Sequence, residues 1–264
     1  MRLGDLWVEE QGGGPALLLL QGLGNSGWPA RRIAPWFSDR RRVIAFDNRG
    51  TGRSSKSPPP DSIAQLANDA AAVLDALGVE QAHVMGHSMG GYIAQTLALQ
   101  RPELVRSLLL VGTGAGVPGH EPVPAATTVI WLANAHLPGT DYARATMYLS
   151  FAEGWTEAHS DLYEELIDER VQYPTPPECW RAQYDACVRF VKRGLPIERI
   201  DVPVLVIHGD ADRVVPISNG QAIARRIPSA ELVVLAGVGH YPYFEAPEAF
   251  AEAALGFLEQ VEAA

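Results

Sequence analysis

The sequence Gly86-His87-Ser88-Met89-Gly90 constrains the fold more than any other part of this 264-residue chain. It follows the apolar run Ala82-His83-Val84-Met85 and precedes a segment of helical pattern over 91–98. In a G-x-S-x-G turn between a strand and a helix, the serine has a strained backbone conformation, and small residues are needed on either side of it. The pattern predicts a nucleophile elbow that exposes the Ser88 hydroxyl above the edge of a sheet.

A serine hydroxyl becomes a good nucleophile only when a base takes its proton and a carboxylate orients that base. Both residue types follow Ser88 in the chain. A predicted buried strand over 204–207 ends in a loop that carries Asp210 and Asp212. The next predicted strand, over 231–235, is followed by His240. The chain order is therefore serine, aspartate, histidine.

This order and these motifs resemble the α/β-hydrolase superfamily, in its serine-nucleophile branch, over essentially the whole chain. Residues 17–24 are similar to the first central strand of that family with its oxyanion loop, and residues 47–54 are similar to its D-x-R-G-x-G-x-S turn. The resemblance implies an α/β fold. We expect a mostly parallel twisted sheet with helices on both faces and a helical cap inserted after a central strand.

The resemblance also implies a catalytic triad. Ser88 is the expected nucleophile, His240 the general base, and Asp212 the orienting acid in a G-x-x-D-x-x-V-P pattern. Asp210 is the second candidate for the acid. The backbone amides of Met89 and Leu23 are the expected oxyanion hole.

One position departs from the family pattern. Many relatives have histidine before the glycine of the oxyanion loop, whereas this chain has Gln21. The backbone donors survive this change, but the side chain beneath the loop differs.

Apolar runs of strand length alternate with helical patterns along most of the chain, which is typical of a parallel sheet covered on both faces. The alternation stops after a predicted strand over 105–111, and the next segment has helical patterns without a convincing strand. We therefore predict a hydrolase core interrupted by a helical cap, with the core over 1–116 and 199–264 and the cap over 117–198.

The predicted cap carries many aromatic side chains. An aromatic lid over a serine favours a hydrophobic or aromatic ester as substrate, although a cap of this size also needs a core of its own. We expect about two or three of the following to face the substrate. They are Trp131, Tyr142, Tyr148, Phe151, Trp155, Tyr163, Tyr173, Trp180 and Tyr184.

Composition excludes several classes of partner. The formal net charge of −10 and the absence of a basic face argue against a nucleic-acid partner. The early apolar run 15–20 is far too short to span a bilayer, so we expect no membrane span and a cytoplasmic location. Cys179 and Cys187 fall in one predicted helix, about 12 Å apart, which excludes a disulfide between them.

Two patterns that suggest other chemistry are set aside. The letters G-x-G-x-x-G at 114–119 follow a strand, but Pro118 and Pro122 interrupt the helix that a dinucleotide site needs. No spacing typical of a metal site occurs, so we expect neither a metal nor a cofactor. His136 and His159 are expected to be structural or surface residues.

The sequence thus predicts a serine hydrolase that cleaves a carboxylic ester, a lactone or a thioester of small-molecule size through an acyl-enzyme. The same triad could serve a carbon–carbon bond hydrolase or a cofactor-free haloperoxidase (perhydrolase). Two further alternatives are a lyase and a ligand receptor with slow or no turnover. The serine excludes the branches that use an aspartate nucleophile, and the oligomeric state stays open.

Overall fold

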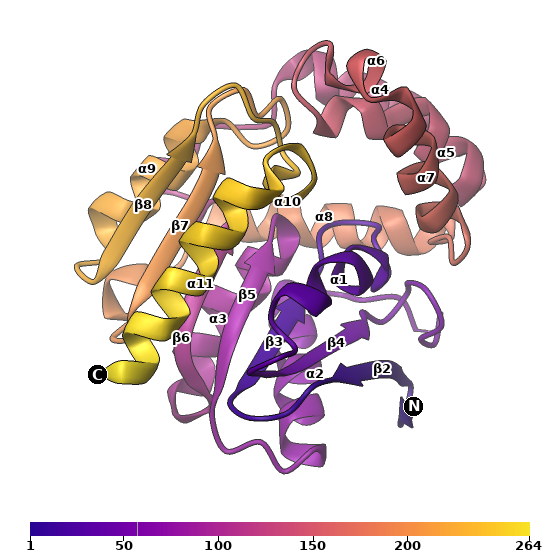
Figure 1. Cartoon of the computed structure of the whole chain (residues 1–264). Helices are drawn as coiled ribbons and strands as arrows, with labels where there is room; N and C mark the ends of the chain where they lie inside the picture. Colours follow the sequence, from indigo (N-terminus) through magenta and orange to yellow (C-terminus); the bar gives the residue numbers. More distant parts are fainter. Residues whose placement is uncertain (57) are drawn as a thin grey trace.

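The computed structural model describes residues 1–56 and 58–264 and has an α/β-hydrolase fold built on an eight-stranded sheet. Along the sheet the strand order is β1-β2-β4-β3-β5-β6-β7-β8 (Figure 1). Every pairing among β3 to β8 is parallel, which confirms the mostly parallel sheet predicted from the sequence. The strands are β1 (Arg2–Leu3), β2 (Leu6–Gln11), β3 (Ala16–Leu20), β4 (Arg42–Asp47), β5 (Ala82–His87), β6 (Val105–Val111), β7 (Val204–Gly209) and β8 (Ala230–Leu235).

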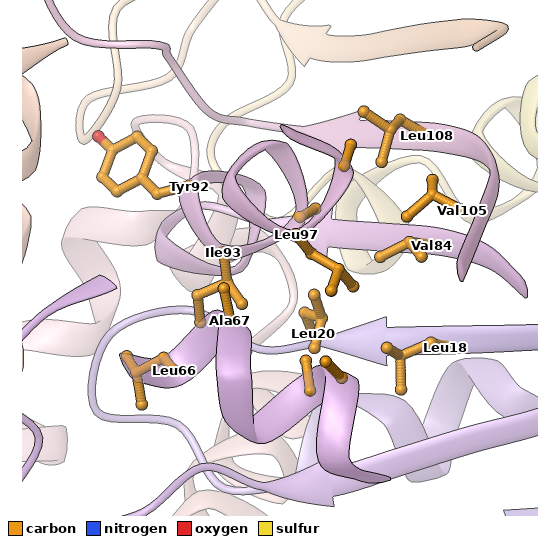
Figure 2. Packing of buried hydrophobic residues seen from close by; sticks show 14 of the residues in the cluster. Leu18, Leu20, Leu66, Ala67, Val84, Tyr92, Ile93, Leu97, Val105 and Leu108 are labelled. Atoms are coloured by element: carbon orange, nitrogen blue, oxygen red, sulfur yellow. The ribbon is translucent and has the colours of Figure 1, made fainter. Parts of the chain in front are cut away.

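The central strands are buried on both faces because helices cover both sides of the sheet. On β3, Leu18 and Leu20 pack into one hydrophobic cluster with α2 (Ile63–Ala76) and α3 (Met89–Gln100) (Figure 2). Leu17 and Leu19, which point the other way, pack into a second cluster with α1 (Trp28–Ile33) and α11 (Pro247–Ala263). The continuous run of leucines in β3 therefore supplies two cores at once.

The sequence analysis missed the first two strands, which are antiparallel to their neighbours. β2 pairs with β1 and with β4, and it buries Leu6 and Val8 on one face. The short apolar run Leu6-Trp7-Val8, with its aromatic and β-branched residues, was the available signal for this strand.

The long segment between β6 and β7 is helical, as the sequence predicts. Within this fully described segment the structure has no strand, and Figure 1 shows α4 to α7 gathered above one edge of the sheet, with α8 running beneath them. The helices are α4 (Ala125–Asn134), α5 (Gly139–Thr146), α6 (Trp155–Ala158), α7 (Ser160–Val171) and α8 (Pro177–Arg193).

Helix α8 belongs to the core as much as to the cap. Its Phe190 ring stacks on Tyr92 of α3 with ring centroids 4.4 Å apart, and Ala186 lies in the same core cluster. The end of the segment predicted as cap therefore forms part of the floor beneath the other cap helices. Its boundary at residue 198 stays a prediction.

Both cysteines lie in α8, and both are free thiols. Among the described helices, none has both the length and the apolar character required to cross a bilayer.

The two-sided burial of β3 makes a matched test of the core possible. We expect Leu18→Ala to lower the free energy of unfolding by about 2–5 kcal/mol, since Leu18 is fully buried and the cavity left behind cannot collapse completely. Leu132→Ala on the surface of α4, where the side chain is 41% exposed, should change it by less than about 0.5 kcal/mol. Urea unfolding of both variants checks the prediction, and equal losses would contradict it.

Candidate active site

Ser88 occupies the turn between β5 and α3 in a conformation that side chains rarely adopt. Its φ is 55° and its ψ −119°, and among residues 1–56 and 58–264 no other non-glycine residue has a positive φ. A Cβ at Gly86 would lie 2.3 Å from the carbonyl oxygen of Gly90, and one at Gly90 would lie 2.1 Å from that of Leu20. Both glycines are therefore required by close backbone approach, and the turn holds Ser88 at the end of β5.

Asp212 and His240 are hydrogen-bonded to each other in the loops after β7 and β8. His240 Nδ1 lies 2.7 Å from Asp212 Oδ2, while Asp212 Oδ1 accepts the amides of Val214 and Val215 at 2.7 and 2.8 Å. Burial by itself would raise the pKa of Asp212, but the imidazoles of His240 and His208 hold this pKa well below its usual range. The ionised carboxylate fixes the proton on Nδ1, which leaves the Nε2 lone pair free to accept a proton.

Asp210, the second candidate for the acid, lies elsewhere. Its carboxylate is exposed and accepts the amide of Gly237 at 2.7 Å. This contact joins the loops after β7 and β8 on the surface.

Ser88 and His240 border the same small cavity, which has a volume of about 40 Å³. No hydrogen bond joins the Ser88 hydroxyl to His240 in the described part of the chain, a common condition for such pairs without a substrate. The structure thus brings the three predicted residues to one edge of the sheet. Their catalytic roles stay predictions.

The amides predicted to form the oxyanion hole lie beside Ser88. Met89 is the first residue of α3, where backbone N–H groups have no partner within the helix. Leu23 follows β3, and its amide donates no hydrogen bond to any other described residue. Both residues line a second cavity together with Ser88, and the buried Gln21 directly follows the end of β3. Both amides are thus left without a partner in the described part of the chain, and their role as an oxyanion hole stays a prediction.

The second cavity is larger, about 380 Å³, and its walls are mostly apolar. Four of the nine cap aromatics named above line one cavity or both, and how many of them face a substrate stays a prediction. The four are Trp131, Tyr142, Trp180 and Tyr184. His136 and His159 are exposed and lie outside both cavities.

Several residues that support the histidine loop were missed by the sequence analysis. His240 N donates to Ser150 O in the cap at 2.9 Å, and His87 Nε2 donates to His240 O at 2.8 Å. Glu245 accepts the amides of Ala152 in the cap and Gly239 in the histidine loop at 2.9 and 3.0 Å. These contacts use backbone groups far apart in sequence, so no local motif announces them.

The ring of His87 is enclosed on all sides. Its Nδ1 accepts from the Tyr243 hydroxyl at 3.2 Å, and its ring packs against those of Tyr241 and His240. Burial lowers the pKa of His87 to about 3, and the nearby His240 adds to this effect. The residue is therefore neutral over the ordinary pH range.

No group of three histidine, cysteine, aspartate or glutamate side chains that could hold a metal ion occurs within residues 1–56 and 58–264. The G-x-G-x-x-G letters at 114–119 lie in the loop between β6 and α4, and α4 begins only at Ala125. The segment therefore lacks the helix that directly follows such a loop in dinucleotide sites.

Comparisons of this chain with known proteins agree with one another on its family. A family model described as the alpha/beta hydrolase fold matches residues 15–247. A protein of Caulobacter sp. (strain K31), provisionally named the carbamate hydrolase RutD, is 32% identical over 96% of each chain. The 2-hydroxymuconate semialdehyde hydrolase of Pseudomonas putida is also 32% identical, over 97% of this chain and 91% of its own. The solved structure of Est816, described as an N-acyl homoserine lactone degrading enzyme, is 29% identical with a TM-score of 0.77 over 96% of each chain.

The buried His87 predicts a loss of stability in mild acid. Its pKa is about 3 in the folded chain and about 6.5 when unfolded, so the unfolded state binds more protons between these values. This contribution to stability is complete above pH 6.5 and falls by about 1.4 kcal/mol per pH unit below it. Asp212 acts in the same direction only at lower pH, since its pKa lies below the usual range of carboxyl groups.

Urea unfolding between pH 7.5 and 4.5 checks this effect. We expect His87→Gln to reduce the pH dependence of the free energy of unfolding by up to about 1.4 kcal/mol per pH unit, which corresponds to one bound proton. This expectation holds whatever the stability of the variant at pH 7.5. His136→Gln is the matched control, because this side chain is exposed in the folded state. An unchanged slope in His87→Gln would contradict the prediction.

Proposed function

Since this chain belongs to the α/β-hydrolase fold family, we propose that it is a serine hydrolase that cleaves a carboxylic ester or a close relative such as a lactone or thioester. One observation carries the proposal. His240, which is hydrogen-bonded to the buried Asp212, borders the same cavity as Ser88, and Ser88 itself is held in the strained turn after β5. This combination matches the needs of acyl transfer.

In the first step, Ser88 Oγ attacks the carbonyl carbon of the substrate while its proton passes to His240 Nε2. The carbonyl oxygen becomes an oxyanion, which the amides of Leu23 and Met89 stabilise. Each such donor typically contributes about 3–4 kcal/mol to the transition state. Asp212 stabilises the imidazolium that forms.

In the second step, the carbon–oxygen bond to the leaving group breaks, and His240 gives its proton to the departing alcohol. Water then attacks the acyl-enzyme as His240 takes one of its protons. The second tetrahedral intermediate releases the acid, and Ser88 regains its proton. No cofactor or metal enters this sequence.

The cavities favour a small-molecule substrate with an apolar part. The larger cavity reaches Ser88 and is walled by Tyr92, Trp131 and Val188 among others, which suits a hydrophobic or aromatic group. The lactone named for Est816 supports lactones as members of the substrate class.

A carbon–carbon bond hydrolase is the second candidate. It is favoured by the 32% identity to the 2-hydroxymuconate semialdehyde hydrolase over nearly the whole chain. The same serine, base and oxyanion donors would serve that reaction. Product analysis separates the two, because carbon–carbon hydrolysis of a ketone yields no alcohol.

The proposal is tested by hydrolysis of p-nitrophenyl esters from acetate to decanoate, with aryl esters and lactones beside them. We expect Ser88→Ala to retain less than about one thousandth of the wild-type turnover, because loss of a triad member removes the nucleophile. Ser229→Ala, whose hydroxyl bonds to Val202 O on the surface, is the matched control and should retain full activity.

Covalent labelling gives a second readout. A fluorophosphonate should label the wild type at Ser88 and leave Ser88→Ala unlabelled. Turnover or labelling that survives in Ser88→Ala would refute the nucleophile. An absence of turnover on every ester and lactone would move support to the carbon–carbon hydrolase, a lyase or a receptor, and slow single turnover would favour the receptor.

The two aspartates after β7 give a further prediction. Asp212→Asn should lower kcat by about three to four powers of ten, since the amide no longer fixes the Nδ1 proton of His240. Asp210→Asn, which affects only a surface contact with Gly237, should change kcat less than about threefold. Steady-state kinetics with thermal unfolding of both variants decides the assignment, and greater damage from Asp210→Asn would reverse it.

A further inference from the structure

One arginine borders the cavity of the proposed active site. Arg170 lies in the last turn of α7, is half-buried, and lines the small cavity together with Ser88 and His240. It also lines an adjoining cavity beside Tyr142 and Trp180. Arg170 therefore borders two adjoining cavities, one of which it shares with Ser88 and His240.

Arg170 has no carboxylate partner within the described residues, although its own helix is rich in acids. Glu164 and Asp168 of α7 pair with Arg144, at 3.1 and 3.2 Å. Their neighbours Glu165 and Glu169 pair with Arg32, at 3.0 and 2.8 Å. These four acids of α7 are thus committed to other arginines.

The walls of the small cavity contain no compensating charge. None of the residues lining it or the adjoining cavity is an aspartate or a glutamate. The polar residues there include Asn25, Thr146 and Ser150, which are uncharged. A guanidinium has five N–H donors, and leaving it half out of water without an anion is unfavourable. A position in the last turn of a helix favours a cation, but an exposed side chain would satisfy the helix dipole equally well.

We propose that Arg170 binds a carboxylate carried by the substrate, in addition to the carbonyl group that reacts at Ser88. This inference rests on the proposed function and narrows its substrate class to esters, lactones or related carbonyl compounds that bear an acid group. The planar guanidinium matches the two oxygens of a carboxylate. The small cavity takes this compact anionic end, and the larger apolar cavity takes the remainder of the molecule.

The test compares charged and neutral esters of similar shape. In one pair the acid is on the alcohol side: 4-acetoxybenzoate against 4-acetoxybenzamide. In the other it is on the acyl side: the 4-nitrophenyl monoester of adipic acid against 4-nitrophenyl hexanoate. Two pairs are needed because the structure does not fix which half of the substrate enters the small cavity.

We expect the wild type to prefer the charged member of at least one pair in kcat/KM. Arg170→Gln should lower kcat/KM for that ester by about 10- to 100-fold and change it for the neutral partner by less than about threefold. Arg170→Lys keeps the charge but lacks the planar guanidinium, so its kcat/KM for the charged ester should lie between those of the wild type and Arg170→Gln. Arg193→Gln, at the exposed end of α8, is the matched control for loss of one positive charge and should leave both esters unchanged.

Binding gives a readout that does not depend on turnover. By titration calorimetry, Ser88→Ala should bind 4-acetoxybenzoate more tightly than 4-acetoxybenzamide, and the double variant Ser88→Ala/Arg170→Gln should lose this difference. Serine-dependent hydrolysis of the neutral esters with no charge preference and no effect of Arg170→Gln would overturn the inference and leave the proposed function intact. If no ester is hydrolysed, the proposed function fails. The calorimetry then decides the inference alone, and equal binding to both Ser88→Ala proteins would overturn it.

Discussion

The close approach of backbone at the turn after β5 is the constraint on which the other features of this structure depend. Gly90 lies so near the carbonyl of Leu20 that any side chain there would displace β3 or α3, and Gly91 lies equally close to Thr113 beyond β6. The start of α3 is therefore in close contact with the chain at the ends of β3 and β6, the two strands on either side of β5. That close packing accompanies the positive φ of Ser88 and places the first residue of α3 directly beside it. The flanking strands, buried on both faces, supply the rigidity that sustains the strain.

The base is positioned differently, by contacts from four separate parts of the chain. Asp212 holds the His240 ring, His87 holds its carbonyl, and Ser150 in the cap holds its amide. A Cβ at Gly112 would lie 3.1 Å from His240 Nδ1, so the end of β6 also makes room for the ring. Because Ser150 and Ala152 both bond to the histidine loop or its brace Glu245, the predicted cap helps to hold the position of His240. A displacement of the cap would alter the position of the base.

This contrast explains what could be predicted from the sequence. The turn around Ser88 is specified within five residues, and the parallel strands are specified by local apolar runs, so both were predicted with their surroundings. The loop pattern singled out Asp212, which lies against His240. Ser150 and Glu245 act through backbone groups of distant segments, and their residue types carry no signal. Arg170 is informative only because Arg32 and Arg144 occupy the acids of α7, and such pairing between separate helices cannot be obtained from spacing alone. The strand β2 was missed for a different reason, since its apolar run is only three residues long and stands near the longer run of β3.

The positions of the proposed reacting groups and of the cavity walls bear on which substrates this chain can select. The two relatives compared at 32% identity carry the names of different hydrolytic activities, so overall likeness does not choose between them. The proposed serine, base and oxyanion donors all come from core loops, and such a set is compatible with several carbonyl substrates. Selection must then come from groups that touch the substrate away from the reacting carbon. Two side chains of the predicted cap are placed for such contacts. Trp131 borders both cavities, and Arg170 gives the small one its only fully charged side chain among the described lining residues. A charge held in that position discriminates more strongly than an apolar wall can, because a substrate without an anion leaves the guanidinium unpaired.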